Sequence, residues 1–435
     1  MQGLATTPMR SQRHRPPSLE NLPTDLLYKV LSQLSVKEAG RTSLLSSRWK
    51  NRWTNHSNLC FDGTSELSSY DADRFVNHVT AVLQHHSRLA VDRFEVRSPA
   101  LGTQHTCHLD RWIGFASASK VKHLVLDLSP PSNYIHRIDE ASKKYKFPEG
   151  SSSWISSTAI SLALGNVCFE LPIPDNGGFK MLKKLELKLV AGLGDLTPLL
   201  SNCHALEWLS INGSYVPHLV VPQIRNLHYL HVKNCGTKII ESHAMNLTTF
   251  EYIERCFVPV KVYQTGKLSK ANIDICCWGC DTVNYFWDEL SCLLTHVDRL
   301  FLTVCMDSKT TGLINNPIAL FHLRYLTLFC NIVRNPHSEL VVLRMTQILK
   351  AAPRLEHFVL HMDSCSREPL SLKTTNCIRP DVHHHHKTRW DGIDPIEMLQ
   401  VPVAHRKMKT QLAIPFSSPV LCRVPQRSML TLPFD

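Results

Sequence analysis

Apolar side chains recur at two spacings along this chain, first at the spacing of a helix and later at that of strands. Near the N-terminus they fall three or four positions apart, as on one face of a helix. This stripe comprises Leu26, Leu27, Val30, Leu31 and Leu34. Leu22 and Pro23 precede it, and proline is tolerated in a first turn because its missing N–H costs nothing there. The pattern predicts an amphipathic helix that begins near Pro23.

Two more short helices are expected directly afterwards. Ser35 and Glu38 form an S-x-x-E capping box, which predicts that a second helix begins at this point. Ser46 or Ser47 is expected to cap a third helix, with Trp49 and Trp53 four positions apart on one face. A unit of about 40 residues rarely buries so many large side chains alone. The surplus leucines and tryptophans must therefore pack on the rest of the chain or on another protein.

From residue 121 onward the apolar pattern becomes that of short strands. A strand is expected over 121–128, and an L-x-x-L-x-L pattern then recurs. Its centres are Leu185, Leu209, Leu230, Phe250, Leu300, Leu326 and Phe358. The first steps are 24, 21 and 20 residues, and a weak repeat is expected at 267–275. These steps are typical of leucine-rich repeats. We expect an α/β fold in which a curved parallel sheet carries helices or loops on its convex side.

The repeat leucines are expected to point inward and form one continuous core, so none is treated as a binding residue. The positions between them are expected to face the concave side, where a partner would bind. Those positions are Lys184, Glu186, Trp208, Ser210, Tyr229, His231, Thr249, Glu251, Arg299, Phe301, Tyr325, Thr327, His357 and Val359. Their mixture of aromatic, charged and small residues is typical of protein recognition. The candidate target-binding residues are Trp208, Tyr229, His231, Glu251, Phe301, Tyr325 and His357.

The N-terminal segment resembles the plant-type F-box that precedes leucine-rich repeats. The residues that carry the resemblance are Leu22-Pro23, Leu26-Leu27, Val30-Leu31, Leu34, Lys37-Glu38-Ala39, Arg41-Thr42-Ser43, Leu45-Ser46, Arg48-Trp49, Trp53 and Leu59-Phe61-Asp62. The resemblance implies docking on the Skp adaptor of an SCF-type cullin-RING ubiquitin ligase. The candidate docking residues are Leu22, Pro23, Leu26, Leu27, Val30, Leu31, Leu34, Leu45, Trp49 and Trp53. Some of them must form the unit's own core, and the sequence does not separate the two groups.

The order of segments is similar to that of plant F-box/LRR proteins with a C-terminal FBD-type segment, from Leu19 to about His386. The expected domains are a disordered basic leader (1–18), the F-box (19–62) and a helical and strand linker (63–120). Leucine-rich repeats (121–362) and the start of an FBD-like segment (363–386) follow. Residues 387–435 lose the family pattern, and six prolines fall between 395 and 433. We expect this divergent tail to be poorly ordered.

Composition and charge narrow the classes of function. With 435 residues, 43% hydrophobic and 20% charged, the chain is globular. Its net charge of +11 is concentrated in the first 60 residues, which leaves a nucleic-acid-binding module that uses Arg10, Arg13 and Arg15 as an alternative. Fifteen cysteines without a secretion signal predict reduced thiols in the cytoplasm or nucleus. No apolar run is long enough for a membrane span.

The chain offers little sign of catalytic or metal chemistry. Cys277 and Cys280 form a C-x-x-C without a matched second pair, so buried thiols are favoured over zinc. The run His383–His386 is expected to be a surface loop, with adventitious metal binding as the alternative. No serine-hydrolase, phosphate-loop, dinucleotide or zinc-protease motif is present. We expect a non-catalytic, cofactor-free receptor subunit of a ubiquitin ligase. A repeat scaffold that works without a ligase is the alternative.

Overall fold

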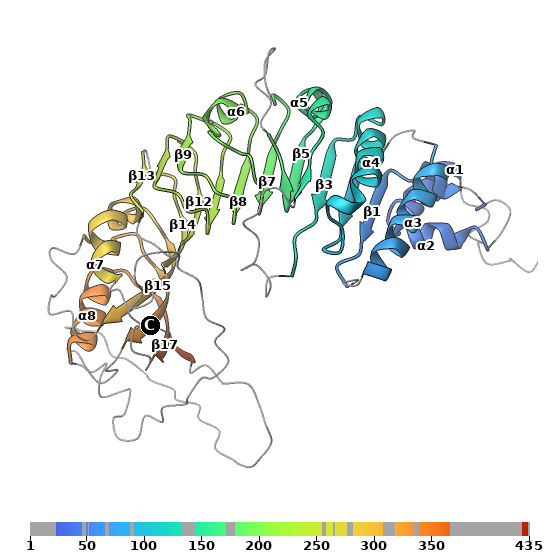
Figure 1. Cartoon of the computed structure of the whole chain (residues 1–435). Helices are drawn as coiled ribbons and strands as arrows, with labels where there is room; N and C mark the ends of the chain where they lie inside the picture. Colours follow the sequence, from blue (N-terminus) through green and yellow to red (C-terminus); the bar gives the residue numbers. More distant parts are fainter. Residues whose placement is uncertain are drawn as a thin grey trace, which may run out of the picture.

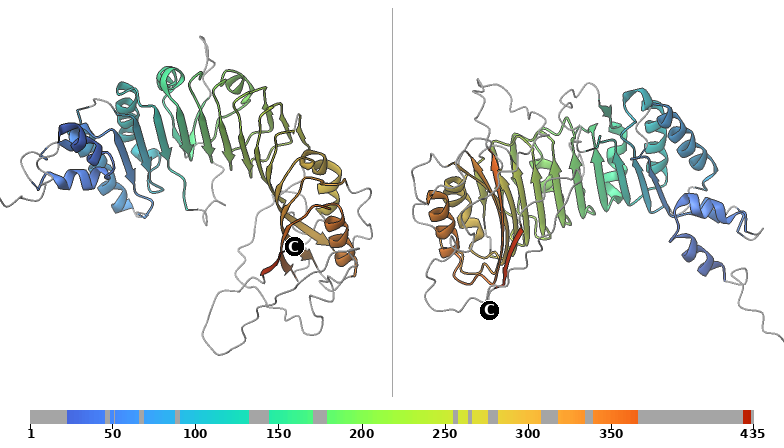
Figure 2. Two further views of the ribbon diagram at one scale, coloured as in Figure 1. Left: turned by 180° about the vertical axis from the view of Figure 1, so that it is seen from behind. Right: turned by 90° about the horizontal axis from the view of Figure 1, so that it is seen from below.

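The computed structural model is a curved stack of parallel strands with helices on its outer side (Figure 1). It describes residues 23–45, 49–50, 52–65, 69–87, 91–131, 144–170, 179–254, 258–263, 266–275, 282–307, 318–333, 339–365 and 429–433. Short helices form one end of the arc, and the C-terminal strand lies at the other end (Figure 2). The predicted α/β fold with a curved parallel sheet is confirmed.

The N-terminal unit, residues 23–55, contains α1 (Thr24–Leu31) and α2 (Val36–Thr42). The predicted capping box is confirmed. The Glu38 N–H donates to Ser35 Oγ at 3.3 Å, and the Ser35 N–H donates to the Glu38 carboxylate at 2.9 Å. Both bonds satisfy N–H groups that a helix start leaves without partners. The second helix therefore begins where the sequence predicts.

The predicted third helix with two tryptophans on one face is wrong for the residues that the structure describes. Trp49 lies in a turn, and Trp53 belongs to a short 3-10 helix, η2 (Arg52–Asn55). The first strand starts only three residues after η2, at Asn58, so the chain has no room for a further helical turn. Ser46 and Ser47, the expected caps, lie outside the described residues.

Twelve of the described strands form one parallel sheet, and each pairs with its neighbours in register. They are β1 (Asn58–Asp62), β2 (Arg93–Arg97), β3 (His123–Asp127), β5 (Ser161–Gly165), β7 (Lys184–Lys188), β8 (Trp208–Asn212), β10 (Tyr229–Lys233), β12 (Thr249–Glu254), β14 (Lys270–Ile275), β15 (Arg299–Asp307), β16 (Tyr325–Val333) and β17 (His357–Cys365). The register aligns one apolar residue per strand, for example Leu185, Leu209, Leu230 and Phe250. All four are at most 1% exposed. The repeats therefore share a single core.

The sheet begins earlier than predicted. Residues 63–120 were expected to be a helical and strand linker, and they contain β2 and two helices, α3 (Ser69–His85) and α4 (Thr106–Ala118). β1 and β2 pair with each other, and β2 pairs with β3. Phenylalanine replaces leucine at Phe61 and Phe94, so these strands lack the leucine pattern. The expected weak repeat at 267–275 is confirmed as β14, whereas β5 was not expected.

The convex side changes character along the arc. It carries α5 (Ser152–Thr158), α6 (Thr197–Ser201), α7 (Val283–Tyr285), a π-helix η7 (Phe286–Leu290) and α8 (Glu339–Lys350). Between α6 and α7 three strands form a second parallel sheet instead: β9 (His218–Val221), β11 (Ile239–Ser242) and β13 (Val260–Val262). Successive repeats are only 20 or 21 residues apart here, from Leu209 to Ala271. So short a repeat has room for a second strand but not for a helix.

Smaller elements complete the described chain. β4 (Tyr145–Lys146) and β6 (Val167–Cys168) form a two-stranded sheet. The short helices η3 (Thr103–His105), η6 (Glu149–Ser151) and η8 (Ser291–Leu294) precede α4, precede α5 and follow η7, respectively.

The last described strand lies within the tail. β18 (Met429–Pro433) pairs antiparallel with β17. The sheet edge explains the pairing, because an edge strand presents unpaired N–H and C=O groups that another strand can satisfy. The start of the FBD-like segment at 363–386 overlaps the end of β17, and residues 366–428 lie outside the described chain. The basic leader at 1–18 also lies outside it.

Two buried histidines join the N-terminal unit to the first repeats. His56 Nε2 lies 2.9 Å from the Leu31 carbonyl oxygen and 3.1 Å from that of Leu34. The Asn58 N–H donates to His56 Nδ1 at 3.1 Å, so Nε2 carries the proton. His86 Nε2, at the end of α3, lies 2.9 Å from the His56 carbonyl oxygen. The end of α1, β1 and α3 are therefore connected by a chain of buried hydrogen bonds.

We expect this junction to weaken in mild acid. Burial lowers the pKa of His86, so the folded protein favours its neutral ring. The unfolded chain takes up the proton at a higher pH, and the stability that His86 contributes is therefore complete above about pH 6.5. Below that pH the free energy of unfolding should fall by at most about 1.4 kcal/mol per pH unit until the folded pKa is reached.

Urea unfolding at pH 7.5 and 5.5 checks this expectation, with His86→Gln as the comparison. The variant should lose less stability between the two pH values than the wild type. Equal losses would show that His86 does not control the acid sensitivity of the junction.

Candidate binding surfaces

The structure separates core from exposed residues in the N-terminal unit, which the sequence could not do. Leu27, Leu31, Ala39 and Trp49 form a small buried cluster, and Leu34 and Trp53 pack against it partly buried. Of α1 and α2, only Val36 belongs to the main core of the repeats. Five of the ten candidate docking residues therefore stabilise the unit itself, namely the buried Leu27, Leu31 and Trp49 and the partly buried Leu34 and Trp53. Leu22 lies outside the described residues.

The remaining candidates leave an exposed apolar surface. Leu26 and Val30 are 43% and 39% exposed, and they lie four positions apart on α1, hence on one face. Leu45 is 66% exposed and Pro23 is exposed at the start of α1. Leu44 is 88% exposed and was not among the candidates. Its signal in the sequence was the Leu44-Leu45 pair in a serine-rich segment. Neighbouring exposed apolar side chains, such as Leu26 and Val30 on one face of α1, are typical of protein-interaction sites.

The seven candidate target-binding residues occupy the outward positions of the sheet, as the alternation predicted. In β8, for example, Leu209 and Ile211 are fully buried, while Trp208 is 37% exposed. The register places Trp208 beside Tyr229 and places Tyr325 beside His357. His231, Glu251 and Phe301 occupy the next outward position of their own strands. Whether these residues contact a target remains a proposal.

The aromatic candidates form two groups rather than one. The Trp208 and Tyr229 rings stack at 3.4 Å, and the Lys184 ammonium lies 5.3 Å from the Trp208 ring centre. Further along the arc, Tyr325 stacks on His357 at 4.7 Å, and the Arg299 guanidinium lies 4.2 Å from the Tyr325 ring. Strands β12 and β14 separate the two groups. The concave side therefore offers two aromatic surfaces, each with a cation beside it.

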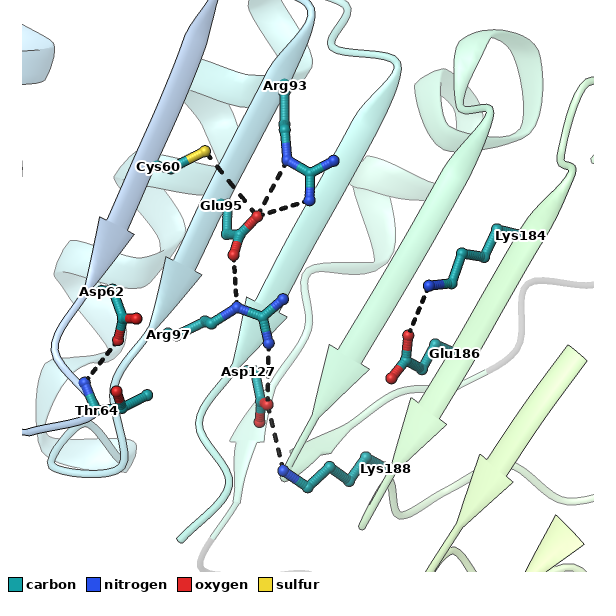
Figure 3. Close-up of polar contacts among 10 residues, drawn as sticks. All are labelled: Cys60, Asp62, Thr64, Arg93, Glu95, Arg97, Asp127, Lys184, Glu186 and Lys188. Atoms are coloured by element: carbon teal, nitrogen blue, oxygen red, sulfur yellow. Dashed lines mark hydrogen bonds and ion pairs between the residues drawn. The ribbon is translucent and has the colours of Figure 1, made fainter. Parts of the chain in front are cut away.

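A charged network on β2, β3 and β7 was missed by sequence reasoning (Figure 3). Glu95 accepts hydrogen bonds from Arg93 at 2.8 Å and from Arg97 at 2.5 Å. Asp127 lies 3.8 Å from Arg97 and 3.4 Å from Lys188. Burial acts to raise the pKa of Glu95, but the hydrogen bonds from the two arginines outweigh it and hold that pKa below its usual value. The alternation Arg-Phe-Glu-Val-Arg was the available signal.

The structure gives no support to the alternative of a metal site within its described ranges. No group of three or more His, Cys, Asp or Glu side chains there could hold a metal ion. Cys277, Cys280 and His383–His386 lie outside those ranges. The cysteines described as free thiols include Cys203 and Cys235, and burial raises the pKa of each to about 12. Such thiols are unreactive at neutral pH. No described helix has the length and apolar content to cross a bilayer.

A small helical unit with exposed leucines, followed by a leucine-rich-repeat arc, defines an F-box protein with leucine-rich repeats. The F-box domain model matches residues 19–61. The chain belongs to the family described as At1g61320/AtMIF1, LRR domain, whose model matches residues 82–390. The resemblance predicted from the N-terminal leucines and the repeats is confirmed.

The relatives of the chain are plant proteins of the same kind. It is 28% identical over 234 residues to the F-box/FBD/LRR-repeat protein At1g78750 of Arabidopsis thaliana, covering 51% of this chain and 48% of the relative. It is 26% identical over 365 residues to the putative F-box protein At1g49610 of the same plant, covering 79% and 84%. F-box/LRR-repeat protein 13 is 25% identical over 276 residues, covering 59% and 56%. The chain thus spans about half the length of several curated relatives it matches.

Proposed function

We propose that this chain is a substrate receptor of an SCF-type ubiquitin ligase. Its N-terminal unit would dock on the Skp adaptor, and through it on a cullin-RING ligase. The repeats would bind a target protein. The observation that carries the proposal is the exposure of four apolar side chains, Leu26, Val30, Leu44 and Leu45, on a unit that already has its own core. The match to the F-box domain supports the same partner, because F-box domains in general bind such adaptors.

The chemistry of this chain would be positioning rather than catalysis. Both matched families, the F-box and the leucine-rich repeat, are non-catalytic binding domains. A target held on the concave side has a raised effective concentration near a ubiquitin-charged enzyme on the same assembly. No cofactor is required for this role. We propose the cytoplasm or nucleus as its location, which the free thiols support.

The exposed apolar residues of α1, Leu26 and Val30, allow a direct test of adaptor binding. Replacing both Leu26 and Val30 by aspartate in the full-length chain should weaken binding to a purified Skp adaptor by at least about 100-fold, since charge is introduced into an apolar contact. The measurement is a titration by calorimetry or interferometry. Leu343→Asp is the matched control, because Leu343 is 51% exposed on α8 at the far end of the arc. The control should bind as the wild type does.

The alternative readings predict other outcomes. A folded wild-type chain that binds no adaptor would favour a repeat scaffold that works without a ligase. The chain would instead be a nucleic-acid-binding module if it bound nucleic acid with an affinity that falls steeply with salt. Neutralising Arg10, Arg13 and Arg15 in the basic leader should then abolish that binding.

A further inference from the structure

Two adjoining hollows lie on the concave side, next to the charged network. The first, of about 300 Å³, is lined by side chains from β2, β3, β5 and β7. The second, of about 450 Å³, is lined from β7 to β12. Lys183 and Lys184 line both hollows, which therefore adjoin across the strands. We call the two hollows together the concave groove.

The first hollow exists because β5 carries small residues. Its outward positions are Ser161, Ala163 and Gly165, between larger side chains on β3 and β7. A Cβ at Gly165 would lie 2.1 Å from Asp127 Oδ1, so only glycine allows Asp127 to occupy its place in the charged network. The floor of the hollow, at Val125 and Ala163, is apolar. The hollow suits a side chain with an apolar stem and a polar end.

The walls of the first hollow present positive charge. Arg93, Arg97, Lys183 and Lys184 line it, against one carboxylate, Glu186. The acidic partners of the arginines are less accessible than the arginines. The Glu95 side chain is 15% exposed and that of Asp127 is 20%, whereas Arg93 and Arg97 are 42% and 37% exposed. The network in Figure 3 therefore holds the guanidinium groups in place while it leaves them open to an incoming anion.

The second hollow is aromatic and close to neutral. Its exposed feature is the stacked pair of Trp208 and Tyr229. Lys183 is paired with Glu207 at 2.8 Å. Burial, followed by the nearby carboxylate of Glu251, raises the pKa of Tyr229, so its hydroxyl stays protonated. A flat apolar side chain would stack on this surface.

We propose that the concave groove binds an extended acidic peptide segment of the target, with an aromatic residue three or four positions from an Asp or Glu. The carboxylate would enter the first hollow and the aromatic ring would stack on Trp208. The spacing follows from geometry. From β5 to β8 or β10 is two or three strand steps, about 10–14 Å, and an extended chain advances about 3.3 Å per residue. This inference rests on the proposed function and specifies its target.

A single-stranded nucleic acid is the rival occupant, since it also combines negative charge with flat rings. Every nucleotide carries a phosphate, however, and the carboxylates of Glu186 and Glu207 line the groove. A strand crossing both hollows would place phosphates near both carboxylates, whereas a peptide needs only one charge. Charge complementarity therefore favours the peptide.

The experiment uses the full-length chain with its Skp adaptor and fluorescein-labelled nonapeptide pools. Each pool fixes positions 3 and 6, or positions 3 and 7, and randomises the others. The fixed pairs are Glu and Trp, Gln and Trp, Lys and Trp, and Glu and Ser, each made in both orders. In one of its two orders, the Glu and Trp pool should bind at least about tenfold more tightly than the other three pools. Its binding should also be tighter at low salt than at high salt. A labelled nonathymidylate tests the rival.

Three variants locate the contact. Lys184→Glu should weaken binding of the Glu and Trp pool at least about tenfold, because it places a like charge at the junction of the hollows. Trp208→Ala should abolish the preference for Trp over Ser and keep that for Glu over Gln. Lys238→Glu, the same charge change at an exposed position just before β11 in the second sheet, should have no effect.

Each other result overturns the inference. These are equal binding of the Gln and Glu pools, wild-type binding by Lys184→Glu, and tighter binding of the nonathymidylate than of any peptide pool. Adaptor retention is measured on the same preparation. An adaptor that binds while the pools show no preference defeats this inference alone. A clear peptide preference without adaptor binding would contradict the proposed ligase role, while the inference that the concave groove binds a peptide would stand.

Discussion

Leu27→Ala is expected to unfold the N-terminal unit and leave the repeats folded. Leu27 is 1% exposed, in a cluster with only three other fully buried residues. Truncating a buried leucine costs about 2–5 kcal/mol, through lost apolar burial and the cavity left behind. A core of four described residues has little stability to lose, and within α1 and α2 only Val36 belongs to the main core. The loss should therefore remain local.

Amide hydrogen exchange followed by mass spectrometry measures the expected difference. Protection should disappear over 24–42 and persist over 208–275, and adaptor binding should fall with it. Leu26→Ala is the control, because Leu26 is 43% exposed and is expected to weaken adaptor binding without any loss of protection. If Leu27→Ala removed protection from both segments together, the unit and the repeats would unfold as one body.

Phe94→Ala should produce a large loss of stability within the repeats. Phe94 is 1% exposed on β2, and its ring contacts those of Phe61 and Phe115 at about 6 Å. These contacts connect β1, β2 and α4, so the cavity would open where three elements meet. A buried Phe→Ala change costs about 3–5 kcal/mol.

The shift of the urea midpoint measures that loss. Phe301→Ala is the matched control, since Phe301 is 37% exposed on the concave side. It should cost less than about 1 kcal/mol, because most of its removed surface is already in water. Equal costs for the two variants would contradict the assignment of Phe94 to the core and of Phe301 to the surface.

The alternation within each strand could be predicted because a strand has a period of two, which assigns every second residue to the same face. Trp208, Tyr229 and His231 were therefore placed correctly from the leucines around them. The same rule failed at β5, where Ser161, Ala163 and Gly165 are too small to show contrast with their apolar neighbours. β1 and β2 use phenylalanine where the later repeats use leucine, so the leucine pattern did not assign these strands to the repeats.

Other features depend on contacts that no local pattern contains. Leu26 and Leu27 are adjacent and identical, and only the packing of α1 on α2 and Trp49 decides which is buried. The link from Arg97 through Asp127 to Lys188 joins residues 91 positions apart in the sequence. It follows from the register of β2, β3, β5 and β7, which the leucine spacing alone did not reveal.

The hydrogen bonds of His56 and His86 link the N-terminal unit to one end of a long sheet, so a small rotation at this link would displace the other end by a large distance. The twelve parallel strands extend about 50 Å along the arc from the N-terminal unit. A rotation of about 10° between the N-terminal unit and the sheet would displace the far strands by up to about 9 Å, roughly two strand spacings. A target bound to those strands would move by the same distance relative to a fixed reactive group. The hydrogen bonds of the two buried imidazoles and the packing of Val36 hold the N-terminal unit against the strands, and they would limit such a displacement.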